Sequence, residues 1–248
     1  MNKVAKVTFS FWVMKICATT LGETGGDLLS MTLKIGYAMS SKIFFGLFLV
    51  TVIMQIASKK FHPLLYWSVI LATSTAGTTM SDFMDRTLHL GYMKGSLILF
   101  TCLLIVLIIW YLTEKSLSVN NIQKPREEMF YWIAILFSNT LGTALGDFLS
   151  LSSGLGFFGS AFLIASVIGL IVLAYFFTKI NRVVLFWIAF VLTRPFGATF
   201  GDLLTKSFSH GGLNLGTVKS SILLGTILLA LVIYTTHKHK KVQQSHKD

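Results

Sequence analysis

The feature that most constrains this chain is a four-fold repeat in which an Asp follows a Trp by fifteen positions, inside an apolar segment. A small residue precedes each Asp, and a Gly lies four positions before that small residue. A second apolar segment follows each Asp, so the pattern predicts four copies of a two-helix unit. The Trp–Asp pairs are Trp12–Asp27, Trp67–Asp82, Trp132–Asp147 and Trp187–Asp202.

The apolar segments are long enough to cross a lipid bilayer, which takes about 20 helical residues. Only 12% of the residues are charged, compared with about 25% in soluble domains, so we exclude a water-soluble globule. We predict an all-α polytopic membrane protein whose eight transmembrane helices form four two-helix repeats. The predicted spans are residues 9–31, 41–58, 66–88, 96–113, 129–151, 159–177, 184–206 and 218–236.

A polar stretch at residues 113–128 divides the chain into two similar halves. Two spans return the chain to the side on which it began, so all four repeats have the same orientation and the halves are parallel. The first half covers residues 1–120, with repeats at 9–60 and 66–115. The second half covers residues 121–248, with repeats at 129–180 and 184–238.

The net charge of +11 comes from short loops between apolar segments. We therefore attribute it to membrane topology and expect no nucleic-acid partner. The loops on the side of the termini carry thirteen Lys and Arg residues, and the opposite loops carry four to six. Because cytoplasmic loops are the more basic ones, both termini are predicted to be cytoplasmic.

The repeated Asp residues lie within the predicted membrane. Fifteen helical residues span about 22 Å, so an Asp that far from an interfacial Trp is still inside a hydrocarbon core about 30 Å thick. A charge there costs about 2.5–3.5 kcal/mol unless it faces a partner or water. Small residues four positions apart permit close helix packing. We expect the first helices of the repeats to pack centrally and the second helices to face lipid.

Basic partners divide the four Asp residues. Arg86 follows Asp82 by one turn and Lys206 follows Asp202 by one turn, so both are predicted to be charge pairs or gating pairs. Asp85 and Arg194 are grouped with these pairs. Asp27 and Asp147 have no such partner, although Lys15, Lys34 or Arg194 could neutralise them from neighbouring helices. The predicted substrate or ion ligands are Glu23, Asp27, Asp147, Thr20, Thr143 and Asn139, and the metal ligands among them are Glu23, Asp27 and Asp147.

The repeats resemble a bacterial family of multi-spanning membrane proteins built from a repeated domain of unknown function, described as membrane-anchored proteins. The resemblance covers nearly the whole chain and implies a protein of the bacterial inner membrane. The strings that carry it are residues 20–27, 81–87, 139–147 and 194–206, with their Gly-x-x-x-Gly/Ser-Asp pattern.

A shorter similarity links Glu23 and Asp27 to the Glu-x-Gly-Asp-[Lys/Arg]-[Ser/Thr] motif of manganese and calcium exchangers. It departs from that motif by one extra residue. Leu28 and Leu29 also replace its basic and hydroxyl residues.

Hard divalent cations prefer carboxylate, carbonyl and water oxygens, and the motif supplies Asp, Glu, Thr and Ser without Cys or His. We therefore predict a transporter for a small cation, chiefly a divalent metal such as manganese, with exchange for protons as an option. One alternative is a transporter of a small organic or anionic solute that uses Arg194, Lys15 and Arg86. Another is a non-transporting membrane scaffold subunit.

Apart from the bilayer and the transported solute, the sequence points to no specific partner. No metalloprotease, hydrolase or phosphate-loop motif is present, so we expect neither an enzyme nor a cofactor. Assembly into a homo-oligomer is compatible with the sequence.

Overall fold

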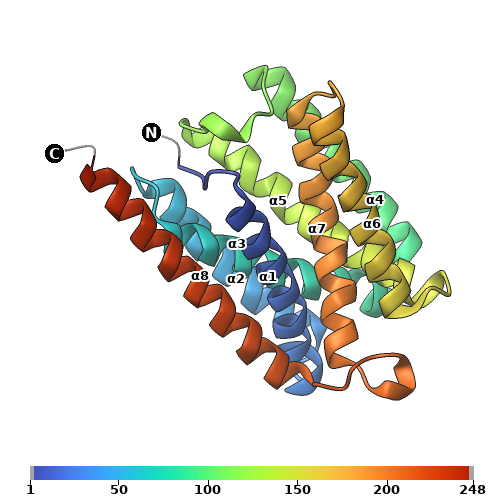
Figure 1. Ribbon diagram of the computed structural model, residues 1–248. Helices are drawn as coiled ribbons and strands as arrows, with labels where there is room; N and C mark the ends of the chain where they lie inside the picture. The colour runs from blue at the N-terminus through green and yellow to red at the C-terminus, as the bar shows by residue number, and fades with distance from the viewer. Residues whose placement is uncertain (1–2, 246–248) are drawn as a thin grey trace.

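The computed structural model describes residues 3–245 and is all-α (Figure 1). Long helices are joined by short turns, and each predicted apolar segment falls on one of them. The helices are α1 (Phe9–Asp27), α2 (Tyr37–Ala57), α3 (Pro63–Asp82), α4 (Tyr92–Glu114), α5 (Pro125–Asp147), α6 (Gly156–Phe177), α7 (Arg182–Thr205) and α8 (Thr217–Ser245).

The helix ends follow local sequence signals. Pro63 and Pro125 begin α3 and α5. At the first position of a helix the backbone N–H has no partner within the helix, so proline loses no hydrogen bond there. Gly36 and Gly91 precede α2 and α4 at φ of +82° and +75°, a backbone conformation that favours glycine. The predicted spans start within four residues of the observed helices, whereas α8 continues to Ser245, beyond the predicted end at residue 236.

Six of these helices are long and apolar enough to cross a membrane. They are α2, α4, α5 with its following turn, α6, α7 and α8 as far as His237. The described helices α1 and α3 fall outside this set because Thr, Ser and charged residues interrupt them. Those polar residues are mostly buried inside the protein.

A π-helical turn follows the motif Asp in the first three repeats. These turns are Leu28–Thr32, Phe83–Thr87 and Phe148–Ser152. π-Helical turns widen a helix locally and occur frequently at functional sites. The fourth repeat differs, because α7 ends at Thr205 and a short 3-10 turn, Phe208–His210, follows.

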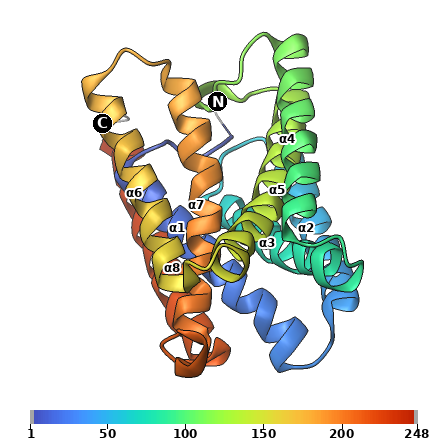
Figure 2. The same cartoon turned by 90° about the vertical axis from the view of Figure 1, so that its right-hand side faces the viewer.

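The first helices of the repeats form a closed central ring. α1 packs against α3 and α7, and α5 also packs against α3 and α7, so each helix touches two others (Figures 1 and 2). The prediction that these helices pack centrally is confirmed.

Glycines allow neighbouring helices of this ring to pack closely. A Cβ on Gly22 of α1 would lie 2.5 Å from Ser74 Cβ of α3, and one on Gly142 of α5 would lie 2.5 Å from Arg194 Cβ of α7. Such distances are below van der Waals contact, so only glycine lets the backbones approach this closely.

The second helix of each repeat packs on the first helix of the next repeat. α2 lies against α3, α4 against α5 and α6 against α7, and α8 closes the circle against α1. Each outer helix contacts its own repeat mainly near the turn that joins its two helices. The contact between α4 and α5 thus joins the two predicted halves of the chain.

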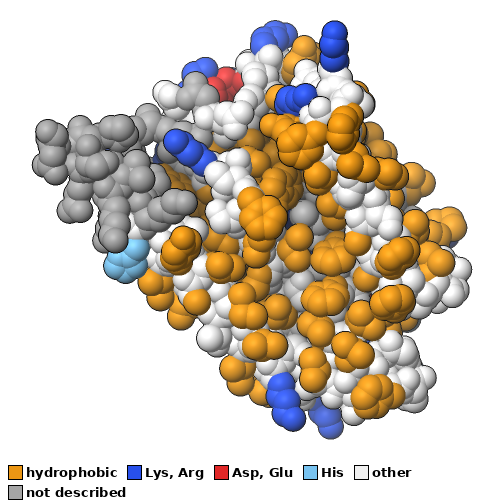
Figure 3. Space-filling view, in the orientation of Figure 1, with side chains coloured by type: hydrophobic (Ala, Val, Ile, Leu, Met, Phe, Trp, Pro, Cys, Tyr) orange, Lys and Arg blue, Asp and Glu red, His pale blue; other side chains and the backbone are white. Residues whose placement is uncertain are grey.

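The outer helices present an apolar surface. Leu, Ile and Phe side chains of α2, α4, α6 and α8 are among the exposed large hydrophobic residues. Hydrophobic side chains cover the middle of the face in Figure 3, and Lys and Arg lie at its upper and lower edges. α1 begins and α8 ends at the same end of the bundle (Figure 1).

Residues before α1 cover that end of the ring. Lys3 and Val4 are buried, and the Lys3 ammonium forms an ion pair with Glu128 of α5, which has no exposed surface. The side-chain amide of Gln55 donates to the Lys3 carbonyl at 3.0 Å and to Glu128 at 3.1 Å.

Candidate functional site

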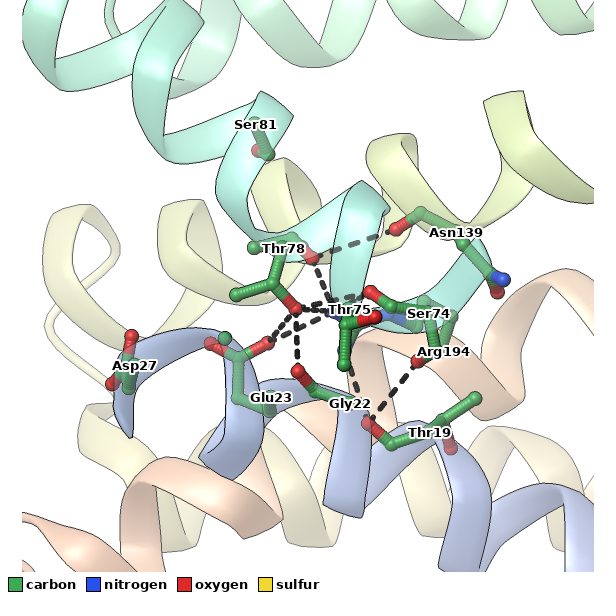
Figure 4. Close-up of polar contacts among 12 residues, drawn as sticks. Thr19, Gly22, Glu23, Asp27, Ser74, Thr75, Thr78, Ser81, Asn139 and Arg194 are labelled. Carbon is green, nitrogen blue, oxygen red and sulfur yellow. Dashed lines mark hydrogen bonds and ion pairs between the residues drawn. The ribbon is translucent and has the colours of Figure 1, made fainter. Parts of the chain in front are cut away.

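The centre of the ring holds a buried ion pair between Arg194 of α7 and Glu23 of α1. Arg194 Nη2 lies 3.0 Å from Glu23 Oε2 and donates to Thr143 Oγ1 of α5 at 2.6 Å and to Thr78 Oγ1 of α3. Thr78 Oγ1 also lies 3.2 Å from Glu23 Oε2. Figure 4 shows Arg194, Glu23 and Thr78 converging between the helices. One guanidinium therefore links all four central helices.

The position of Arg194 explains this reach. It lies eight residues before its motif Asp, whereas Glu23, Thr78 and Thr143 lie four residues before theirs. One turn of helix is about 5.4 Å, which the extended arginine side chain covers. Gly142 leaves room for its stem. The Arg194 side chain is fully buried.

A second polar group lies further toward the termini. Lys15 of α1 is fully buried, and its Nζ lies 3.3 Å from Asn139 Oδ1 and 4.1 Å from the centre of the Phe190 ring. Asn139 Nδ2 in turn donates to Thr73 Oγ1 at 3.0 Å. In the described structure Lys15 forms no ion pair with a carboxylate.

Lys206 bridges two motif Asp residues at the opposite side of the centre. Its Nζ lies 3.0 Å from Asp202 Oδ1, one turn earlier on α7, and 2.6 Å from Asp27 Oδ2 on α1. Both carboxylates are buried, while the Lys206 side chain is 25% exposed. The predicted Asp202–Lys206 pair is confirmed, with Asp27 as a second partner.

Arg86 bridges the other two motif Asp residues. Its Nε lies 2.8 Å from Asp82 Oδ1, and its Nη2 lies 3.1 Å from Asp147 Oδ2 on α5. Arg86 Nη1 also donates to Tyr37 Oη at 3.2 Å. The centre of the Tyr92 ring lies 5.8 Å from Arg86 Cζ. The predicted Asp82–Arg86 pair is confirmed, and the guanidinium is held on several sides.

These contacts correct the sequence-based division of the Asp residues. Asp27 and Asp147 were expected to lack a basic partner of their own, with Lys15, Lys34 or Arg194 as candidates to neutralise them. Each instead shares a base that belongs to the motif of another repeat. Ring closure brings that base across, and spacing along one helix could not show it.

Ring closure also determines which of the predicted metal-ligating carboxylates lie together. Carboxylate oxygens of Glu23, Asp27 and Asp202 lie within 4.8 Å of one another, and all three residues are buried. Among the described residues, Asp147 is not part of this group. Glu23 and Asp27 are therefore brought together as expected, and Asp202 takes the place expected for Asp147.

The remaining predicted ligands divide between the centre and the helix backbone. Thr143 accepts from Arg194, and Asn139 accepts from Lys15. The Thr20 hydroxyl instead donates to the Ile16 carbonyl of its own helix at 2.9 Å. Asp85 forms no ion pair with Arg86 in the described structure.

Sequence reasoning missed two participants of the site. Thr78 is not among the predicted site residues, and its place opposite Glu23 follows only from the ring. Tyr37 was not considered. Its signal is the repeated Gly-Tyr pair at the start of α2 and α4, Gly36-Tyr37 and Gly91-Tyr92.

Comparison with known proteins bears on the repeat and not on the site. Neither the curated proteins nor the solved structures contain a match to the chain. The family model described as Repeat of Unknown Function (DUF347) matches residues 10–61, 65–116, 130–181 and 185–241. Its four matches coincide with the four two-helix units and cover most of the chain, which therefore belongs to this repeat family.

Proposed function

We propose that this protein is a membrane transporter for a small cation, with a divalent metal such as manganese as substrate and protons as the exchanged ion. We further propose that all eight helices cross the bacterial inner membrane and that both termini are cytoplasmic. α1 has 19 residues and α3 has 20, close to the length of about 20 that a membrane span requires, and their polar residues are mostly buried in the ring. The excess of Lys and Arg on the side of the termini supports the orientation.

The observation that carries the proposal is the convergence of Glu23, Asp27 and Asp202. Divalent cations bind oxygen at about 2.0–2.6 Å, so two ligand atoms on one ion lie at most about 4–5 Å apart. The observed spread of 4.8 Å or less meets that limit without movement of the helices. A manganese-sized ion prefers such oxygen ligands.

The charges of the site favour a divalent ion. The Lys206 ammonium already occupies a cation position between Asp27 and Asp202. Its side chain is 25% exposed, and a lysine stem has many rotatable bonds, so we expect an entering ion to displace it. Once Lys206 has moved away, the three carboxylates and the Arg194 guanidinium carry a net charge of two negative units, which a divalent cation neutralises. In this scheme Lys206 is a gating residue and Arg194 a fixed one.

The second Asp pair has a different role in the proposed mechanism. Arg86 is bound to Asp82 and Asp147 and is also held by Tyr37. An arginine stays protonated and its planar fork suits two-carboxylate contacts. We therefore assign this group to holding α3 and α5 together while the Lys206 side opens.

The scaffold alternative is favoured by one specific observation. Each carboxylate of the proposed site already has a basic partner within 3.0 Å, as a purely structural network requires. The anion alternative has less support, because Arg194 already donates to Glu23, Thr78 and Thr143 and offers little to a solute.

Manganese uptake into proteoliposomes that contain a metal-quenched dye tests the proposal. Wild type is expected to take up manganese faster than empty liposomes. Asp27→Asn and Asp202→Asn each remove a ligand and are expected to reduce the rate at least about tenfold, which is the effect of about 1.4 kcal/mol. Asp147→Asn lies outside the ligand set and is expected to reduce it less.

Glu127→Gln is the matched control, because this acid lies outside the membrane beside Lys124 and is expected to leave uptake unchanged. Each variant's unfolding midpoint is measured in parallel. Absence of manganese uptake by folded wild type, or normal uptake by folded Asp27→Asn and Asp202→Asn, contradicts the proposal. The scaffold alternative predicts lower unfolding midpoints without any uptake to lose.

A further inference from the structure

The position three residues after the motif Asp differs in one repeat. It is a hydroxyl residue in the first, third and fourth repeats, and Asp85 in the second. Ser30 and Ser150 donate to the carbonyl one turn earlier, at 2.8 Å and 2.9 Å. A carboxylate cannot donate in this way, so Asp85 needs another environment.

Two neighbouring positions have changed together with it. The residue before the motif Asp is Gly in the other repeats and Ser81 here, and Ser81 Oγ donates to Asp85 Oδ2 at 3.3 Å. The fourth residue after the turn glycine is Ser40, Ser160 or Ser220 in the others and Gly95 here. A Cβ at position 95 would lie 2.9 Å from Asp85 Cγ and overlap Oδ1. The second repeat thus supplies both a donor and space for one carboxyl group.

Asp85 has no counter-ion in the described structure. The residue is 6% exposed, and its Oδ1 is buried without a hydrogen-bond partner among the described atoms. Arg86, the neighbouring base on the same turn, directs its nitrogens to Asp82 and Asp147 instead. From α2 and α4, Tyr37 and Tyr92 flank Arg86, and the exposed Lys94 precedes Gly95 on α4.

A single buried carboxylate without a cation costs far more free energy than the neutral acid, because the acid carries no charge. We propose that Asp85, together with Ser81 and Gly95, is a proton-binding site. A proton adds to Oδ1 to give the neutral carboxylic acid, and its release returns the carboxylate and delivers the proton to water. That this is the proton exchanged for the cation rests on the proposed function.

Infrared difference spectroscopy of the purified protein in lipid tests the site without any transport. A step from low to high pH is expected to remove a carbonyl band of a protonated carboxyl group from the wild-type spectrum. Asp85→Ser, which installs the residue of the first and third repeats, is expected to lack that band. Ser81→Gly, which installs the glycine of the other repeats, is expected to keep the band at a shifted frequency. Glu127→Gln is the control and is expected to match wild type.

The outcomes separate this site from the proposed function. A wild-type band that persists in folded Asp85→Ser, or no band in wild type at any pH, overturns the proton site. If Asp85→Ser does not fold, an unshifted wild-type band in Ser81→Gly overturns it. Manganese-driven proton release from proteoliposomes, reported by an internal pH dye, is expected in wild type and absent in Asp85→Ser. Loss of the band in Asp85→Ser without manganese uptake by wild type refutes only the transport function.

Discussion

The buried pair of Arg194 and Glu23 makes a prediction that can be measured as a coupling energy. Arg194→Gln leaves a carboxylate that is 3% exposed without its cation, and Glu23→Gln leaves a fully buried guanidinium with only neutral acceptors. Removing one partner of a buried pair costs about 3–5 kcal/mol. The double variant leaves no charge, so its cost is expected to fall about 2–3 kcal/mol below the sum of the single costs.

Equilibrium unfolding of the four proteins in mixed detergent micelles gives the three free-energy differences. Arg182→Gln, at the exposed start of the same helix, is the control and is expected to change the free energy of unfolding by no more than about 0.5 kcal/mol. Additive costs for the two single variants, within about 0.5 kcal/mol, would refute the reasoning, since they would mean that the two charges do not stabilise one another in the folded protein.

Further predictions concern the ring and the segment before α1. Gly142→Ala places a methyl group 2.5 Å from Arg194 Cβ and is expected to lower the free energy of unfolding by about 1–3 kcal/mol. Gly169→Ala on α6 adds a Cβ that would meet no described atom within 4 Å outside its own helix backbone. It is expected to raise the free energy of unfolding by up to about 1 kcal/mol, and equal effects of the two variants would contradict the close contact at Gly142. Lys3→Met leaves Glu128 buried without its cation, so hydrogen exchange at the start of α5 is expected to accelerate. Unchanged protection there would show that the segment before α1 does not stabilise the start of α5.

Much of the fold could be predicted because membrane helices are specified locally. A bilayer-length apolar segment with Gly at one end defines a helix without knowledge of its neighbours. The small residues at Gly22 and Gly142 indicated which helices pack closely, because close backbone approach needs no other signal. The packing of each outer helix on the next repeat was not predictable, since the apolar faces of α2, α4, α6 and α8 are much alike.

The candidate site was predictable only where it lies on one helix. Asp82–Arg86 and Asp202–Lys206 follow from a spacing of four residues. The partners that cross the ring, Arg194 with Glu23 and Lys206 with Asp27, depend on the order of the helices and on their relative heights. Neither quantity is encoded in the spacing of one segment.

The closure of α8 onto α1 has a consequence for chain connectivity. Because α8 covers α1 in the way that α2 covers α3, the circle has no repeat that is first or last in space. A circular permutant that begins at Pro63, with a linker from the end of α8 to the start of α1, should therefore retain the same helix contacts. Half of the chain expressed alone would carry one outer helix with no surface to cover and one inner helix left bare, and two such halves would complete each other.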